Sequence, residues 1–222
     1  MCFSAEADLA IGVVVTAIGI DAVHHNDRRH LTPLATLPVV FGLHQLTEVF
    51  VWLGLDGRLP ADVATTATSI YLTVALVFLP VFIPVATSLA GQPARWEIVA
   101  FTGTGLVVAA TMGLALLDGP ATSAIEAHHI HYVVHVWQRD PLIALYAIAT
   151  CGPLLRSTDQ RLVWPGAVNV VAGLALVWID QTAFVSLWCL WAAVVSAAIA
   201  LYVRASRTLE ERGATSRRLM TD

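Results

Sequence analysis

The chain has 222 residues, of which 57% are apolar and only 13% are charged, and its formal net charge is −4. Soluble globular domains are closer to half apolar and a quarter charged, so this composition argues against an ordinary soluble enzyme, a disordered chain and a nucleic-acid-binding protein. All 12 basic residues are Arg, which excludes mechanisms that need a Lys amine, such as a Schiff base. At about 20 residues for each membrane-spanning helix, the length suits six or seven spans.

Long stretches with few or no charges follow one another along the chain. Unpaired charges are costly in hydrocarbon, so each stretch predicts a membrane span. In chain order, the predicted spans are residues 9–20, 33–55, 63–90, 98–117, 141–155, 162–179 and 182–203. They are apolar nearly all round, whereas the strands of a β-barrel would alternate in polarity. We therefore predict an all-α bundle of seven transmembrane helices over residues 1–203, followed by a polar tail over residues 204–222.

The distribution of Arg predicts the orientation of this bundle. If the N-terminus lies outside, the outer segments carry only Arg58 and Arg139, and the other Arg residues lie on the cytoplasmic side. This bias places the N-terminus outside and the C-terminal tail in the cytoplasm. Glu6 and Asp8 stand where a cleavable signal peptide would be basic, so we expect the first helix to be retained. We predict a multi-pass protein of the inner (cytoplasmic) membrane, with lipids as partners, no nucleic acid, and a second copy of the chain as the candidate protein partner.

The second predicted span carries polar residues at helical spacing. His44, Glu48 and Trp52 are four residues apart and share one helix face. The helical rise puts Glu48 about 10 Å and His44 about 16 Å below Leu55, between the midplane and the outer surface. An acidic residue at this depth favours a functional role. The structural alternative is a buried acid that is hydrogen-bonded to a Tyr, a Trp or the backbone, and His44 is equally compatible with a ligand, a proton relay or a packing residue.

The longest connection between spans, the outer loop 118–140, contains half of the His residues of the chain. As a strand, it would point His129, His131 and His135 the same way, whereas a helix would align His128 with His131 and His135. Imidazole and carboxylate groups are the usual ligands of zinc and also suit other transition metals. We therefore predict a divalent metal, zinc first, in a pocket in the outer half of the bundle. The predicted ligands are His44, Glu48, His129, His131 and His135. The alternative is that the loop His residues are surface residues without a ligand.

Cys2 is a further candidate for catalysis, beside Glu48. Removal of Met1 would leave Cys2 with a free thiol and a free α-amine, which together can chelate a metal or act as nucleophile and base. The alternative is a short, partly ordered chain end.

Four segments resemble an uncharacterised bacterial family of small multi-pass membrane proteins. They are Met1-Cys2-Phe3-Ser4-Ala5, Pro38 to Trp52 with its core His44-Gln45-x-x-Glu48, His129-Ile130-x-Tyr132, and Phe184-Val185-Ser186-Leu187-Trp188-Cys189. The resemblance covers nearly the whole chain and implies a membrane protein. It points to Cys2, His44, Glu48 and His129 as motif positions, and it implies no particular reaction.

These observations leave three functions open. The first is a metal-dependent hydrolase of lipid-like substrates, in which His residues hold the metal and Glu48 is a ligand or the general base. This reaction class is suggested by alkaline ceramidases, which are seven-helix proteins with an intramembrane zinc on His ligands; the present chain differs because its last span has no His. The second is a proton or metal-ion transporter or channel, which needs a polar trail towards the cytoplasm, for which Asn169 and Thr111 are the candidates. The third is a non-catalytic membrane sensor, which the short tail disfavours.

Overall fold

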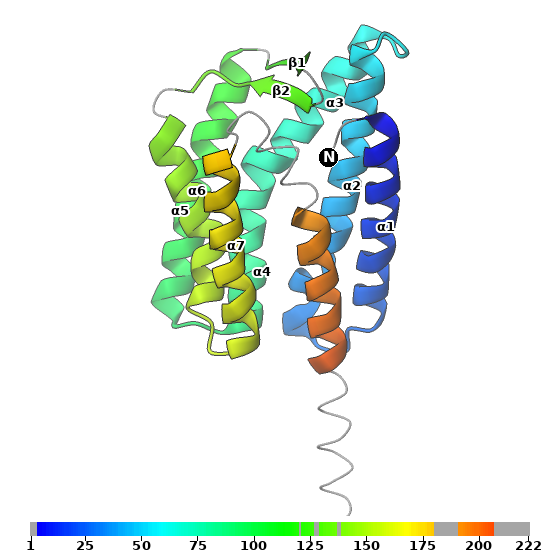
Figure 1. Cartoon of the computed structure of the whole chain (residues 1–222). Coiled ribbons are helices and arrows are strands. Elements are labelled where there is room, and N and C mark those ends of the chain that lie inside the picture. Colours follow the sequence, from blue (N-terminus) through cyan, green and yellow to red (C-terminus); the bar gives the residue numbers. More distant parts are fainter. Residues whose placement is uncertain (1–3, 120, 127–128, 137–138, 180–190, 207–222) are drawn as a thin grey trace, which may run out of the picture.

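The computed structural model describes residues 4–119, 121–126, 129–136, 139–179 and 191–206, without the side chains of residues 126, 129 and 176–179. It shows a bundle of helices with a small β-hairpin across one end (Figure 1). The helices are α1 (Ala5–His24), α2 (Thr32–Leu55), α3 (Ala61–Thr73), α4 (Leu79–Gly91), α5 (Arg95–Asp118), α6 (Arg139–Leu155), α7 (Gln160–Ile179) and the helix Trp191–Ser206. A 3₁₀ turn, η1 (Arg29–Leu31), precedes α2, and a π-helical turn, η2 (Val74–Phe78), joins α3 to α4.

Four helical stretches are long and apolar enough to cross a membrane. They are Ala5–His24, Arg29–Leu55, Ala61–Gly91 and Arg95–Asp118. The all-α class is confirmed, and these stretches support the prediction of a membrane protein. Each of the seven predicted spans overlaps a helix, but α6 has 17 residues and Trp191–Ser206 is also short. The first part of the last predicted span and residues 207–222 of the predicted tail lie outside the described residues.

Helices α1 and α2 are antiparallel and lie side by side (Figure 1). Glycines at the contact allow the two backbones to approach closely. A Cβ on Gly42 of α2 would lie 2.5 Å from the backbone N of Thr16 and 2.8 Å from its Cα, and Gly19 of α1 meets the backbone of Val39 in the same way. This close approach places the first turns of α1 against the polar residues in the second half of α2.

The stretch from α3 to α4 is one long helix with an altered central turn. The π turn η2 and Pro80, which has no backbone N–H, both leave carbonyl groups of this stretch without their α-helical partners. The Tyr146 hydroxyl of α6 donates a hydrogen bond to the carbonyl of Ala75 at 3.1 Å. On the next turn, the carbonyl oxygen of Pro80 lies directly against Gly105 of α5. Helices α5 and α6 therefore both pack against this irregular stretch.

The outer loop contains an antiparallel hairpin of β1 (Thr122–Glu126) and β2 (His129–Val133), in which Ala124 lies opposite His131. The strand alternative for this segment is therefore the correct one up to Val133. Ile130, with 2% of its surface exposed, packs in the same buried cluster as Val49 and Trp52 of α2, and Tyr132 packs against that cluster. The hairpin thus covers the end of the bundle where α2 ends and α3 begins (Figure 1).

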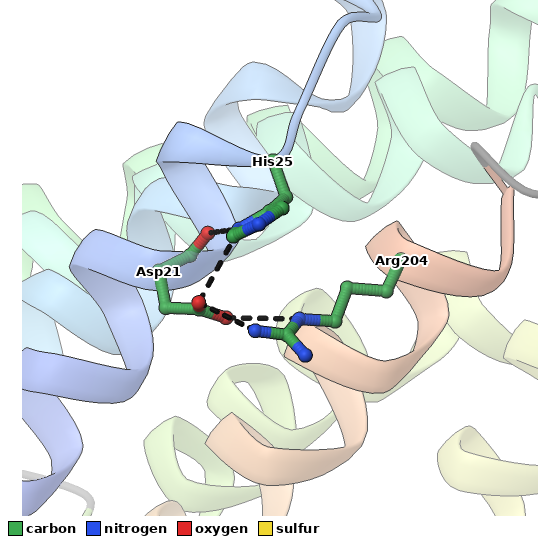
Figure 2. Close-up of polar contacts among 3 residues, drawn as sticks. All are labelled: Asp21, His25 and Arg204. Atoms are coloured by element: carbon green, nitrogen blue, oxygen red, sulfur yellow. Dashed lines mark hydrogen bonds and ion pairs between the residues drawn. The ribbon is translucent and has the colours of Figure 1, made fainter.

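The opposite end of the bundle is held by ionic contacts. The Arg204 guanidinium on the helix Trp191–Ser206 contacts both carboxylate oxygens of Asp21 on α1, with Nε–Oδ2 at 3.0 Å and Nη2–Oδ1 at 2.5 Å. Asp21 Oδ1 also lies 3.2 Å from Nδ1 of His25 (Figure 2). These contacts fasten the last described helix to α1 at the end that the Arg distribution predicts to be cytoplasmic.

Candidate functional site

A buried polar cluster lies where α1, α2 and β2 meet. Its members are Asp8 of α1, Gln45 and Glu48 of α2, and Tyr132 of β2; we call it the Asp8–Glu48 cluster. The exposed fractions of Asp8, Gln45 and Glu48 are 0%, 3% and 1%. Gln45 Nε2 donates to Asp8 Oδ1 at 2.5 Å and lies 3.4 Å from Glu48 Oε2. The Tyr132 hydroxyl donates to Glu48 Oε1 at 3.2 Å.

Local sequence explains how these side chains converge. The Ser4 hydroxyl caps α1 by accepting the N–H of Ala7 at 3.3 Å, so the helix begins at Ala5 and Asp8 lies one turn inside it. Gln45 and Glu48 are three residues apart and therefore lie on the same side of α2. Alternation along β2 puts Tyr132 on the same strand face as the buried Ile130, which faces the helices.

Three aromatic rings stack beside the cluster. The His44 ring lies 4.0 Å from the Tyr71 ring with 12° between their planes, and the Tyr71 ring lies 4.9 Å from the Tyr132 ring with 18° between planes. Within the described part of the chain, the buried His44 Nδ1 and the buried Trp52 Nε1 have no hydrogen-bond partner. These two nitrogens lie one helical turn on either side of Glu48, so α2 presents a carboxylate between two buried nitrogens.

The structure brings together some predicted site residues and separates others. Glu48 is buried and hydrogen-bonded to a Tyr, and His44 joins the same region through the ring stack. His131 lies on β2, and strand alternation puts it on the face opposite Tyr132. His135 is exposed after the end of β2, where it lines a small pocket with Asp118.

The remaining predicted residues cannot be placed in the site. The side chain of His129 and all of Cys2 lie outside the described residues. Among the side chains that are described, no three or more His, Cys, Asp or Glu residues are grouped so that they could hold a metal ion. The described residues alone therefore do not assemble the predicted ligand set.

Asp8 and Gln45 are the members of the cluster that sequence reasoning did not select. The first predicted span, residues 9–20, starts directly after Asp8, so the apolar pattern alone leaves Asp8 outside it. The signal that identifies it is Ser4, a good N-cap four residues earlier, which moves Asp8 from the flank into the helix. Gln45 appears in the motif His44-Gln45-x-x-Glu48, but an uncharged amide gave no reason to assign it a role.

A second polar network links three helices in another part of the bundle. Trp191 Nε1 donates to Asn169 Oδ1 at 2.5 Å, and Asn169 Nδ2 donates to the Cys151 Sγ at 3.2 Å, which links the helix Trp191–Ser206, α7 and α6. Of the two residues predicted for a polar trail, Asn169 thus belongs to an interhelical network. Thr111 instead donates to the carbonyl of Val107 in its own helix.

Together these features define a helical protein, apolar enough to cross a membrane, with a buried carboxylate and aromatic cluster under a terminal hairpin. The sequence matches the family of unknown function DUF6629 over residues 1–216, and the chain belongs to this family. The predicted membership of an uncharacterised family is therefore confirmed. Comparisons with curated proteins and with solved structures gave no match.

Proposed function

We propose that this chain is an integral protein of the cytoplasmic membrane with seven spans, an outer N-terminus and a cytoplasmic C-terminus. We propose further that a divalent metal, zinc first, is bound near Glu48 in the outer half of the bundle and that the site hydrolyses a lipid-like substrate. The four apolar helical stretches and the concentration of Arg at one end support the membrane topology.

One contact is the main support for the site, the hydrogen bond from Tyr132 to Glu48. It joins strand β2 of the hairpin to a carboxylate inside an apolar helix. Tyr132 directly follows His131 and lies three residues after His129, so the contact brings the backbone of the His-rich strand to the level of Glu48, with His131 on the opposite strand face. A carboxylate and nearby imidazoles are the ligand types that zinc prefers.

The chemistry that a bound divalent metal supplies is activation of water at neutral pH. In this proposal the His residues hold the metal, and Glu48 either completes its coordination or accepts the proton of the attacking water. Cys2 provides a further ligand or a nucleophile. A lipid-like substrate fits because the cluster is surrounded by helices with exposed apolar side chains, such as Leu9 and Leu43. An amphipathic molecule can approach such a site from the bilayer.

Metal analysis of the purified full-length protein in detergent tests this proposal. We expect a stoichiometric divalent metal, which is lost in the double variant His131→Ala, His135→Ala. The matched control is His24→Ala, His30→Ala, which removes two exposed His residues at the other end of the bundle. A folded wild-type protein that holds no metal, and whose stability does not respond to added zinc or to chelator, would overturn the proposal.

A second candidate function, proton or ion transport, is supported by the interhelical network of Asn169, Cys151 and Trp191. The π turn η2 also favours this function, because such turns are frequent at functional sites. Ion flux into liposomes that contain the protein tests this function. Flux that is abolished by Glu48→Gln supports transport, and the absence of flux for protons and for divalent metals refutes it.

A further inference from the structure

We propose that Asp8 is a second acidic ligand of the site, and that Asp8 and Glu48 bind one divalent cation as a carboxylate pair that Gln45 holds in position. This inference rests on the proposed function, and it adds to the site a residue on another helix. The ligand set then contains two carboxylates, whereas the set of the proposed function contains His residues with Glu48 as the single carboxylate.

The geometry of Gln45 brings the two carboxylates close together. Asp8 Oδ1 and Glu48 Oε2 both lie within reach of the same amide nitrogen, at 2.5 and 3.4 Å. The two oxygens are therefore no more than about 6 Å apart. Each carboxylate oxygen can accept more than one contact, so the hydrogen bonds from Gln45 and Tyr132 do not by themselves prevent Asp8 and Glu48 from binding a cation. Small movements of either side chain would bring both oxygens to the metal–oxygen distances of about 2.0–2.6 Å.

Electrostatics favours a cation between these groups. Two ionised carboxylates about 6 Å apart repel each other by about 3 kcal/mol at an effective dielectric constant of 20. Both groups are buried, at 0% and 1% exposure, so bulk water screens this repulsion poorly. A divalent cation within reach of both carboxylates replaces the repulsion by two attractions.

A separate observation also points to a ligand at this place. Trp52, only 5% exposed, has an indole N–H without a hydrogen-bond partner among the described residues, one turn from Glu48 on the same helix face. Its buried cluster includes Ala5, which lies one turn before Asp8, and Ile130 of the hairpin. Buried donors are rarely left without a partner unless a ligand or an ion with its water accepts them. A hydrated cation supplies such an oxygen, and His44 Nδ1 on the opposite side of Glu48 is a further available ligand atom.

Cation titrations of the metal-stripped, full-length protein in detergent test the inference. Zn²⁺ and Mn²⁺ are titrated separately into wild type, Asp8→Asn and Glu48→Gln, and binding is followed by calorimetry. Asp62→Asn is the matched control, because Asp62 is an exposed acid in the first turn of α3. We expect Asp8→Asn to weaken binding at least tenfold, and Asp62→Asn to leave it unchanged.

The possible results separate this inference from the function on which it rests. If Glu48→Gln loses the cation while Asp8→Asn binds like wild type, Asp8 is not a ligand but the metal site stands. If wild type binds neither cation, both proposals fail. If Asp8→Asn does not fold, Asp8→Glu is measured, since it keeps the charge and displaces the oxygens by one methylene. Affinity equal to that of wild type in that variant overturns the assignment, and weakened binding supports it.

Discussion

Replacement of Gly42 by Ala should separate α1 from α2 and weaken the fold measurably. The added Cβ would lie 2.5 Å from the backbone N of Thr16 and 2.8 Å from its Cα, where ordinary contacts begin at 3.4 Å. Backbone atoms cannot rotate away, so the helices must move apart by close to 1 Å. Overpacking of this kind costs about 1–3 kcal/mol. Because Gly42 is one turn from Gln45, the same movement should lengthen the contact between Gln45 and Asp8.

Denaturant unfolding of the purified protein in detergent, followed by Trp fluorescence, measures this effect. The control is Gly103→Ala in the middle of α5, where an added Cβ meets no atom within 4 Å. That variant should be as stable as wild type or gain up to about 1 kcal/mol from the better helix propensity of Ala. The expected difference between the two variants is therefore at least about fivefold in the unfolding equilibrium constant. Equal unfolding midpoints would refute the close approach of α1 and α2.

Three other predictions concern single contacts. Tyr132→Phe keeps the ring stack but removes a donor to the buried Glu48, so the free energy of unfolding should fall by about 1.5–3 kcal/mol; an unfolding midpoint equal to that of wild type would contradict this. Zinc at 100 times its dissociation constant should stabilise wild type by about 2.7 kcal/mol, and Glu48→Gln should show no such gain in thermal unfolding. Arg204→Gln should lower stability slightly at low salt and not at high salt, since its contact with Asp21 is partly exposed; a loss that persists at high salt would show a contribution beyond the ion pair.

The helical architecture was predictable because it follows from composition. The chain has seven stretches that are nearly free of charge, and a helix satisfies the backbone hydrogen bonds of such a stretch in lipid within the stretch itself. Each predicted stretch overlaps a helix. The ends of the helices were less predictable. The first predicted span began at residue 9, whereas α1 begins at Ala5, because the Ser4 cap adds a turn that contains two acidic residues.

The candidate site was only partly predictable, because it depends on contacts between distant elements. The helical spacing of His44, Glu48 and Trp52 is enough to identify Glu48 as a candidate site residue. The proximity of Glu48 to Asp8 depends instead on the register of α1 against α2. That register is set by glycines such as Gly42, whose role appears only when the facing backbone is known. The conformation of the His-rich segment was similarly ambiguous, because the spacing of its His residues suits a strand and a helix equally. The antiparallel pairing with β1 determines that a strand forms.

The π turn Val74–Phe78 accommodates one additional residue between two packing surfaces of the same helix. An α-helix turns by about 100° for each residue, so a residue inserted into regular winding would rotate everything after it by that angle. The wider π turn takes up the additional residue within one turn, so α3 and α4 keep nearly the register of an uninterrupted helix. Tyr71 can therefore face the ring stack while Pro80 lies against Gly105 on the same continuous rod.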